Sequence, residues 1–284
     1  MRGPLHRGPF RHPRLQHHHR AGRRSRGPGR GGAVTAFLTW GSGAPLICLH
    51  GIGGAADLWA PTAAALPGRQ VLAWNQPGYG GNPLLADLSF STLADNLAAE
   101  LVQKGITSAD FIGHSMGGMV AIELALRHPG LVRTLIPYAT TPAFGGKDPS
   151  FARDFLAKRL APLDAGASMA ECAAGLVRGM CAPTADPAAE PAAIAAMSLV
   201  PEATYRATLA CLTTFDRRDA LGAITQPTHC IAGAEDKVAP ARTMQRMADA
   251  IPGATLSLIP GAGHLPHLEQ PAAFHATLRS LLDR

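Results

Sequence analysis

Seven short apolar runs, separated by stretches with helical periodicity, constrain the fold of this chain more than any other feature of its sequence. Nearly continuous apolar strands that alternate with helices are typical of a parallel sheet covered on both faces. The sequence therefore predicts an α/β fold. The seven strand-like runs are Val34–Thr39, Leu46–Leu49, Gln70–Trp74, Asp110–Ile112, Thr134–Tyr138, Thr228–Ala232 and Thr255–Ile259.

Three segments between these runs carry apolar residues three or four positions apart, which predicts helices with one buried face. Ser89 or Ser91 is placed to cap the first helix, and the second ends before His128-Pro129-Gly130. The third begins near Pro271. The three apolar faces are, in order, Phe90, Leu93, Leu97 and Leu101; Met119, Ile122 and Ala125; and Phe274, Leu278 and Leu281.

Residues 143–205 interrupt the alternation of strands and helices. They are rich in Ala, Pro and Met and show no strand pattern, whereas Phe151, Phe155, Leu156 and Leu160 have helical spacing. A long insertion at one end of a sheet is usually functional. We therefore predict a helical cap at 143–205, inserted into a core made of residues 33–142 and 206–284.

The positive charge of the chain is confined to residues 1–32. The formal net charge is +6, but these residues hold nine arginines and no acid, and the other 252 residues carry 17 basic and 20 acidic side chains. The folded body is therefore not expected to bind nucleic acid. The Arg/Gly/Pro/His-rich leader lacks apolar side chains for a core, so we predict that it is disordered. An incidental extension is the favoured interpretation of it, and a nucleic-acid-binding tail is the alternative.

Other features exclude whole classes of protein. No apolar run approaches the roughly 18–20 residues that a membrane-spanning helix needs, so no membrane partner is expected. The five cysteines are scattered without C-x-x-C spacing. Such a set argues against a disulfide framework or a zinc site and suits a reducing cytoplasm.

The pentapeptide Gly113-His114-Ser115-Met116-Gly117 follows one predicted strand and opens a predicted helix. This is G-x-S-x-G in a strand–turn–helix context, where the serine stands on a sharp turn with its hydroxyl exposed. Ser115 is therefore a candidate nucleophile. The backbone N–H of Met116, at the start of the helix, is a candidate donor to a developing oxyanion.

A glycine-rich loop, His50-Gly51-Ile52-Gly53-Gly54, follows the second predicted strand. Its glycines allow the backbone to approach a ligand closely, and the N–H of Ile52 is the candidate second oxyanion donor. No G-K-[ST] or G-x-G-x-x-G pattern follows, which disfavours nucleotide binding. We interpret His50 as a structural histidine that is hydrogen-bonded within its loop.

A nucleophilic serine needs a histidine base and an acid that orients it, here in the chain order Ser, Asp or Glu, His. Glu235 and Asp236 follow the sixth predicted strand, and His264 follows the seventh. Asp236 is preferred to Glu235 because a shorter side chain holds an imidazole more rigidly. His264 is preferred to His267 because it directly follows a glycine-rich turn, where we expect it to be better exposed.

Together, His50–Gly54, Gly113–Gly117, Gly233–Asp236 and Gly261–His264 with Glu269-Gln270-Pro271 resemble the motifs of the α/β-hydrolase superfamily over residues 34 to 284. The resemblance implies a mostly parallel eight-stranded sheet with a helical cap after the sixth strand. It also implies a catalytic triad and an oxyanion hole. The implied triad is Ser115, His264 and Asp236, and the implied oxyanion donors are the N–H groups of Ile52 and Met116.

Within the superfamily, the chain is most similar to 3-oxoadipate enol-lactonase-like enzymes of aromatic-compound catabolism and to meta-cleavage-product hydrolases. The first resemblance implies hydrolysis of a small carboxylic ester or lactone through an acyl-enzyme, and the second implies cleavage of a carbon–carbon bond. Neither needs a metal or organic cofactor. A non-catalytic ligand receptor on the same scaffold is the alternative of another class. The cap cations Arg153, Lys158, Arg159 and Arg178 are candidates to meet a substrate carboxylate.

Two departures from the family pattern concern loops. Asn75 and Asn82 stand where a family loop normally has Asp and Ser, and Gly54 stands where carbon–carbon hydrolases usually carry a proline. Enzymes of this fold that cleave epoxides or carbon–halogen bonds use an aspartate nucleophile, so Ser115 excludes them. The departures affect the subgroup and leave the implied triad intact.

Overall fold

The structure is a computed structural model of the 284-residue chain and describes residue 3 and residues 36–145 and 149–283. The predicted disordered leader at 1–32 lies outside the described residues, apart from Gly3. No helix of the described part is long and apolar enough to cross a membrane.

Each of the seven predicted strand-like runs overlaps a strand of one sheet within the described residues. The strand order is β1-β3-β2-β4-β5-β6-β7, and β1 is antiparallel to β3 whereas the other neighbours are parallel. The predicted α/β class is therefore confirmed. The strands are β1 (Phe37–Trp40), β2 (Ala44–Leu49), β3 (Arg69–Trp74), β4 (Ala109–His114), β5 (Val132–Tyr138), β6 (His229–Gly233) and β7 (Thr255–Ile259).

The strand order reverses next to β2. From β2 the chain passes to β3 on one side, and later to β4 on the other. In open α/β sheets, ligands bind outside the carboxyl ends of the strands at such a switch point. The loops that follow β2 and β4 carry the two glycine-rich motifs, so the topology brings the motifs together.

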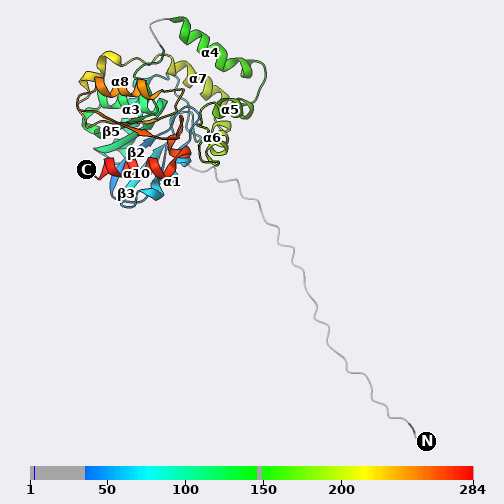
Figure 1. The fold of residues 1–284 in the computed structure, drawn as a ribbon, viewed down its shortest axis with the longest axis horizontal. Coiled ribbons are helices and arrows are strands. Elements are labelled where there is room, and N and C mark those ends of the chain that lie inside the picture. The colour runs from blue at the N-terminus through cyan, green and yellow to red at the C-terminus, as the bar shows by residue number, and fades with distance from the viewer. Residues whose placement is uncertain (1–2, 4–35, 146–148, 284) are drawn as a thin grey trace. The chain divides into compact units, whose positions relative to one another are not determined.

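Helices cover both faces of the sheet (Figure 1). In β2, Ile47 and Leu49 pack in one core cluster with α2, α3 and α8, whereas Leu46 and Cys48 pack in another with α10. This alternation is the expected period of two for a strand buried on both sides. The core helices are α1 (Ala60–Ala65), α2 (Phe90–Gln103), α3 (Met116–Arg127), α8 (Ala241–Ala250), α9 (Pro266–Glu269) and α10 (Pro271–Leu282).

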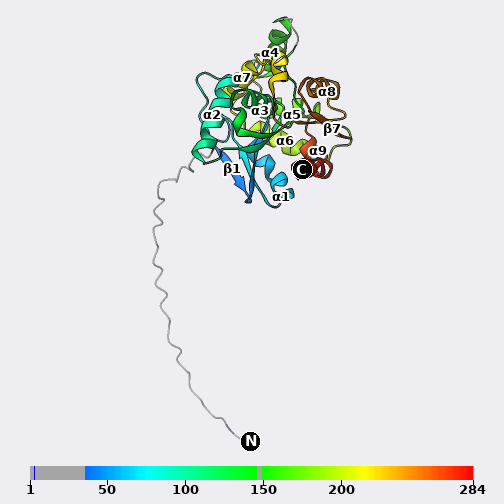
Figure 2. The same ribbon diagram turned by 90° about the vertical axis from the view of Figure 1, so that its left-hand side faces the viewer.

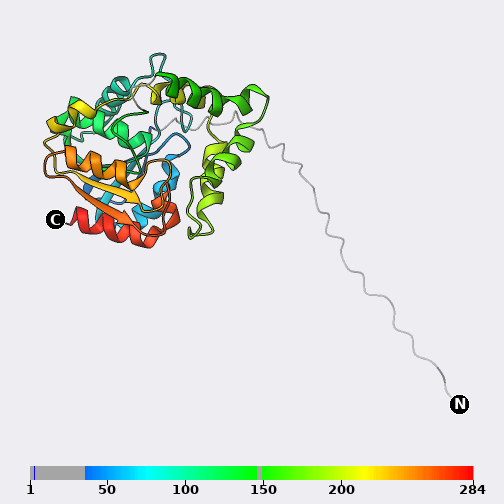
Figure 3. The ribbon, with the colours of Figure 1, turned by 45° about the horizontal axis from the view of Figure 1, so that its top comes forward.

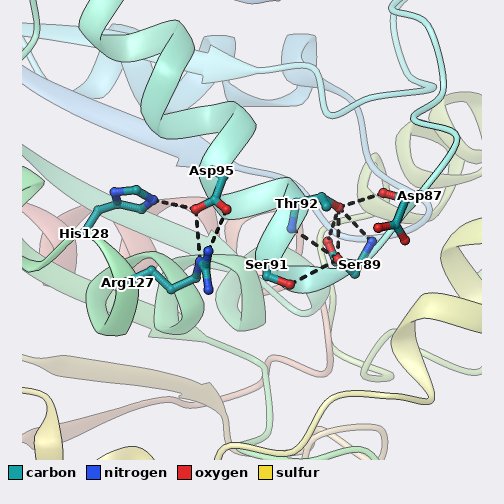
Figure 4. A network of polar contacts seen from close by, with 7 residues as sticks. All are labelled: Asp87, Ser89, Ser91, Thr92, Asp95, Arg127 and His128. Carbon is teal, nitrogen blue, oxygen red and sulfur yellow. Dashed lines mark hydrogen bonds and ion pairs between the residues drawn. The ribbon is translucent and has the colours of Figure 1, made fainter.

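Polar contacts fix α2 at its start and along its length (Figure 4). Ser89 and Thr92 form a reciprocal capping box, which confirms Ser89 as the cap. Asp95 accepts hydrogen bonds from Arg127 at 2.6 Å and contacts His128 at 2.7 Å. These contacts tie α2 to the C-terminal end of α3, at the opposite end of that helix from Ser115.

The cap lies between β5 and β6, and its helices stand beyond one end of the sheet (Figure 3). Figure 2 shows α4 projecting from the other cap helices. The cap begins and ends at a short antiparallel bridge between Ala143 and Asp216, where Phe144 N–H donates to Phe215 O at 2.7 Å. Its helices are α4 (Pro149–Asp164), α5 (Met169–Arg178), α6 (Ala189–Ser198) and α7 (Glu202–Leu212).

Two details implied by the resemblance differ from the structure. The sheet has seven strands within the described residues, not eight, and the cap follows the fifth of them. The predicted cap boundary at residue 205 falls inside α7, because Tyr205, Leu209 and Leu212 continue one buried helical face across it.

Candidate active site

Ser115 stands on a strained turn between β4 and α3. Its backbone angles are φ 50° and ψ −117°, in the region that residues with a side chain rarely adopt. A Cβ added to Gly113 would lie 2.3 Å from Gly117 O, and one added to Gly117 would lie 2.4 Å from Leu49 O. Both glycines of the motif are therefore required by the close approach of backbone to backbone.

Hydrogen bonds hold the turn in place from the neighbouring strand. Ser115 N–H donates to Tyr138 O at 3.0 Å, and the Thr140 hydroxyl donates to Ser115 O at 2.7 Å. The backbone at Ser115 is thus fixed by β5 and the residues after it. Its side chain makes no capping bond to α3 and lines a cavity at the end of the sheet.

His264 and Asp236 form a buried hydrogen-bonded pair. His264 Nδ1 lies 2.9 Å from Asp236 Oδ2, and the two residues are 4% and 5% exposed. The other carboxylate oxygen, Oδ1, accepts the N–H groups of Val238 at 2.7 Å and Ala239 at 2.9 Å. Glu235 is exposed, so the structure places Asp236 and not its neighbour against the imidazole.

The surroundings of Asp236 keep it ionised. Burial acts to raise the pKa of this carboxyl, but the adjacent His264 and the two N–H donors outweigh burial and hold the pKa below its ordinary value. An ionised Asp236 accepts a hydrogen only from a protonated Nδ1. His264 Nε2 is then unprotonated in the neutral ring and can accept a proton.

His267 lies near His264 but in different surroundings. Its ring stacks on Trp59 with centroids 5.5 Å apart, and its Nδ1 has no hydrogen-bond partner among the described residues. Burial, with the neighbouring His275 and His264, lowers the pKa of His267 to about 3. The expectation that His264 is better exposed than His267 is wrong, because both rings are buried, at 4% and 6%. What separates them is the contact with Asp236.

The glycine-rich loop after β2 is anchored by His50. His50 Nδ1 lies 2.8 Å from Gly51 O and Nε2 accepts the N–H of Gln76 at 3.3 Å, as in a neutral ring protonated at Nδ1. Burial lowers the pKa of His50 to about 4. The interpretation of His50 as a structural histidine is confirmed. Tyr79 adds a second anchor, since its hydroxyl donates to Ile52 O at 2.8 Å.

The two candidate oxyanion donors are backbone N–H groups that the described residues leave without an acceptor. Within the residues that the structure describes, neither Ile52 N–H nor Met116 N–H donates to a protein acceptor. Ile52 lines the cavity, and Met116 is the first residue of α3. A helix N-terminus carries partial positive charge that favours an anion.

The cavity that Ser115 and His264 line has a volume of about 150 Å³. Its other walls are mostly apolar, and Met180 and Met197 of the cap lie opposite the sheet. Methionine side chains adapt to irregular shapes, so this wall can adjust to ligands of different shape.

The four cap cations occupy different surroundings. Arg153 pairs with Asp154, and Arg178 pairs with Glu190. Lys158 is exposed and Arg159 lines the cavity. The Arg159 guanidinium lies 5.3 Å from the ring centroid of Phe155 and has no carboxylate partner in the described part of the chain.

Two supporting residues, Gln76 and Tyr79, were not predicted to support the oxyanion loop. Gln76 also donates through its side chain to His50 O. Both belong to the loop that begins at Asn75, which we compared with a family loop in the sequence without assigning it a supporting role. Contacts over 26 or 27 residues follow from the pairing of β2 with β3, which local sequence does not reveal.

A family model described as alpha/beta hydrolase fold matches residues 44–271. The chain is 34% identical over 251 residues to a Variovorax paradoxus protein named "Putative carbamate hydrolase RutD", covering 85% of this chain and 91% of that one. It is 29% identical to a pimeloyl-[acyl-carrier protein] methyl ester esterase from Photobacterium profundum, covering 88% and 100%.

Solved structures share the same architecture. A hydrolase from Pseudomonas aeruginosa PA01 superposes with a TM-score of 0.78 at 26% identity, covering 87% of this chain and 94% of that chain. The enol-lactonase from Burkholderia xenovorans LB400 also gives a TM-score of 0.78, at 21% identity with 87% and 96% covered. At that identity the likeness shows the fold alone.

Proposed function

The chain belongs to the α/β-hydrolase family, and from that premise we propose that it is a serine hydrolase that cleaves a small carboxylic ester or lactone through an acyl-enzyme. One observation carries the proposal. The buried His264–Asp236 pair and the strained Ser115 lie at the same end of one sheet, where His264 and Ser115 line one cavity. These are the residue types and roles of a nucleophile, a general base and the acid that orients the base.

Each residue has a defined step in this mechanism. Ser115 Oγ attacks the substrate carbonyl carbon while His264 Nε2 takes the hydroxyl proton. The carbonyl oxygen becomes an oxyanion, which accepts hydrogen bonds from Ile52 and Met116 N–H. Each such donor is typically worth about 2.7–4 kcal/mol in the transition state. His264 then gives its proton to the leaving alkoxide, and the acyl group stays on Ser115.

In the second half of the reaction, water takes the place of Ser115 as the nucleophile. Water enters, His264 takes one of its protons, and the resulting nucleophile attacks the acyl-enzyme carbonyl. Collapse of the second oxyanion returns the proton to Ser115 and releases a carboxylic acid. Asp236, ionised throughout, stabilises the imidazolium that forms in both halves.

The cavity supports a small acyl group. An apolar protein cavity of about 150 Å³ accommodates a molecule the size of benzene, and this cavity has a volume of about 150 Å³. Arg159 adds one cation to its apolar wall. We therefore expect preference for a short acyl chain, and for one that bears a carboxylate at the end away from the ester.

A carbamate is the second candidate substrate, because relatives at 34% and 32% identity carry the name carbamate hydrolase. A carbamate presents the same carbonyl oxygen to the Ile52 and Met116 N–H groups. The carbon–carbon hydrolase and receptor alternatives have no comparable observation in their favour.

The test compares wild type with Ser115→Ala on a short-chain p-nitrophenyl ester, an enol-lactone, an aryl carbamate and a meta-cleavage dienoate. We expect wild-type turnover of the ester and loss of about 10⁶-fold in kcat in Ser115→Ala, the size seen when a catalytic serine is removed. Intact mass after a fluorophosphonate reaction should show one adduct on wild type and none on the variant.

Ser42→Ala is the matched control. Ser42 is exposed in the turn before β2, at the far end of the sheet from the cavity, so its loss should change neither rate nor labelling. Equal ester turnover by wild type and Ser115→Ala would remove the nucleophile from the mechanism. Absence of any turnover and any adduct in wild type would instead favour the ligand receptor.

A further inference from the structure

Glu269, the last residue of α9, has a buried carboxylate that accepts three backbone hydrogen bonds. It is 1% exposed. Oε2 accepts Gly263 N–H at 2.8 Å and Ala182 N–H at 2.7 Å, and Oε1 accepts Leu265 N–H at 2.7 Å. No lysine or arginine in the described ranges pairs with it. The three N–H groups therefore provide the compensation that a buried carboxylate needs.

Two of these donors flank His264, and the third belongs to the cap. Residues 261–265 form the loop that carries His264, here called the histidine loop. Residues 180–186 connect α5 to α6, here called the cap segment. Glu269 thus joins the histidine loop on both sides of His264 to the cap segment through one carboxylate.

Direct contacts connect the same two segments. His264 N–H donates to Met180 O at 2.9 Å, and the cap segment also binds the backbone of Glu269, since Asp186 N–H donates to Glu269 O at 2.8 Å. A Cβ added to Gly263 would lie 2.3 Å from Met180 O, so the two backbones are in close contact there. Met180 also lines the cavity beside His264.

The contact continues to the start of the histidine loop. Gln270 donates from its side chain to Thr184 O at 2.9 Å and to Gly261 O at 3.1 Å, and the Thr184 hydroxyl donates to Gly261 O at 3.1 Å. Polar contacts with the cap segment, direct or through Glu269 and Gln270, therefore occur from Gly261 to Leu265 of the histidine loop.

We propose that Glu269 is a positioning residue for the histidine base, and that it holds the histidine loop and the cap segment together as one unit. The proposal rests on the proposed function, in which His264 takes the proton of Ser115. In this role the cap segment helps to fix the position of His264, whose N–H it binds through Met180 O. Glu269 itself lines no part of the cavity.

The role requires a carboxylate and not merely a polar group of that size. All three partners are N–H donors, so both oxygens must accept. A glutamine at this position presents one oxygen and one NH₂ group. In either orientation of the amide, the NH₂ group faces at least one backbone N–H. The hydrogen bond to that N–H is then lost.

Glu269→Gln tests the proposal against Asp110→Asn. Asp110 is 2% exposed, is held by Arg69 and Arg133, and lies at the opposite end of β4 from Ser115. The number of active sites is measured from the fluorophosphonate adducts present when the labelling reaction is complete. Each kcat is then calculated per labelled site and refers to folded enzyme only. We expect kcat of Glu269→Gln to fall by at least about tenfold, towards the 10²-fold that a displacement of about 1 Å costs. KM for a short ester should change by less than about threefold, and Asp110→Asn should keep its kcat while losing stability.

Amide hydrogen exchange gives a readout that does not depend on turnover. In Glu269→Gln, exchange should rise together in the histidine loop and the cap segment, and in Asp110→Asn in neither. The proposal is overturned if Glu269→Gln matches Asp110→Asn in kcat per site or leaves exchange of the two segments unchanged. Inactivity of wild type, or activity of Ser115→Ala, would contradict the proposed function. The exchange result would then still decide whether Glu269 holds the histidine loop and the cap segment together.

Gly263→Ala serves as a second variant, and it decides the question if Glu269→Gln does not fold. Its methyl group meets Met180 O and separates the two segments without removing a charge. The same loss of kcat and the same paired rise in exchange are expected. A wild-type kcat in this variant would overturn the proposal.

Discussion

The floor of the cavity and its roof present different kinds of group to a ligand. The floor consists of the loops after β2, β4, β6 and β7, and its polar groups are bound in place: Asp236 alone accepts three hydrogen bonds. The roof consists of α4 to α7 and presents mainly apolar side chains to the cavity. Phe151 of α4 is 50% exposed, and Arg159 has no carboxylate partner among the described residues.

The difference separates chemistry from selectivity. A floor fixed by hydrogen bonds is preorganised for charge that develops in the transition state. The methionines and other apolar side chains that the roof presents can adapt to ligands of different shape. Changes in the floor should therefore lower kcat for every substrate, and changes in the roof should alter the ranking of substrates.

The largest effect should come from Asp236→Asn. An asparagine does not stabilise the imidazolium and favours the wrong tautomer of His264, so we expect kcat to fall by about 10⁴-fold for all substrates alike. Steady-state kinetics on a neutral and a carboxylate-bearing ester measure it. Glu235→Gln, at the exposed neighbouring position, should behave as wild type; a comparable loss in that variant would show that the acid was assigned to the wrong residue.

Acid should act on the floor and not on the roof. His50 and His267 are buried with pKa values of about 4 and about 3, whereas residues 143–212 contain no histidine. In the unfolded chain these rings titrate near 6.5. Because the unfolded state binds protons first, the stability that these rings contribute is complete above pH 6.5 and falls between 6.5 and 4, by up to about 1.4 kcal/mol per pH unit for each ring.

Urea unfolding of wild type and His267→Phe between pH 7 and 4.5 measures this effect. The variant should lose stability less steeply, by up to about 1.4 kcal/mol per pH unit. Parallel curves would show that His267 is not the buried neutral group described above. Asp236 acts in the same direction but in a lower pH range: its lowered pKa contributes stability above about pH 4, which is lost as the pH falls below its unfolded value.

The smallest effect should come from the roof. Arg159→Gln should reduce kcat/KM for an ester with a terminal carboxylate by about tenfold, equivalent to about 1.4 kcal/mol, and leave the matched neutral ester within about twofold. Arg178→Gln is the control, because Arg178 already pairs with Glu190 and does not line the cavity. An equal loss for both esters would mean that Arg159 supports the shape of the roof and does not contact substrate.

Much of the fold could be predicted because local patterns determine it. Each apolar run from the sequence is a strand, and Ser89 caps α2 as expected. The eighth strand was implied by resemblance alone, and the described residues do not contain it. The cap boundary was misplaced because a change in composition does not mark the end of a buried helical face such as that of α7.

The candidate site could be predicted in part. Chain order and strand ends predicted Ser115, Asp236 and His264 as candidates. In the structure Ser115 and His264 line one cavity, and His264 is hydrogen-bonded to Asp236. The burial of His264 was missed, because the cap segment that covers it lies about 80 residues earlier in the chain. The contacts of Glu269 were missed for the same reason: nothing local shows that Ala182 N–H points at it.

The antiparallel bridge between Ala143 and Asp216 has a consequence for how such a protein could acquire new substrates. The chain leaves the sheet after β5 and returns to it at the neighbouring β6. The intervening stretch is therefore an insertion whose two ends are joined by this bridge. A stretch of different length or sequence could be exchanged there without moving β5 or β6. Recombination at this bridge would keep the reaction and replace the specificity, provided that the new insertion also supplies a backbone donor for Glu269.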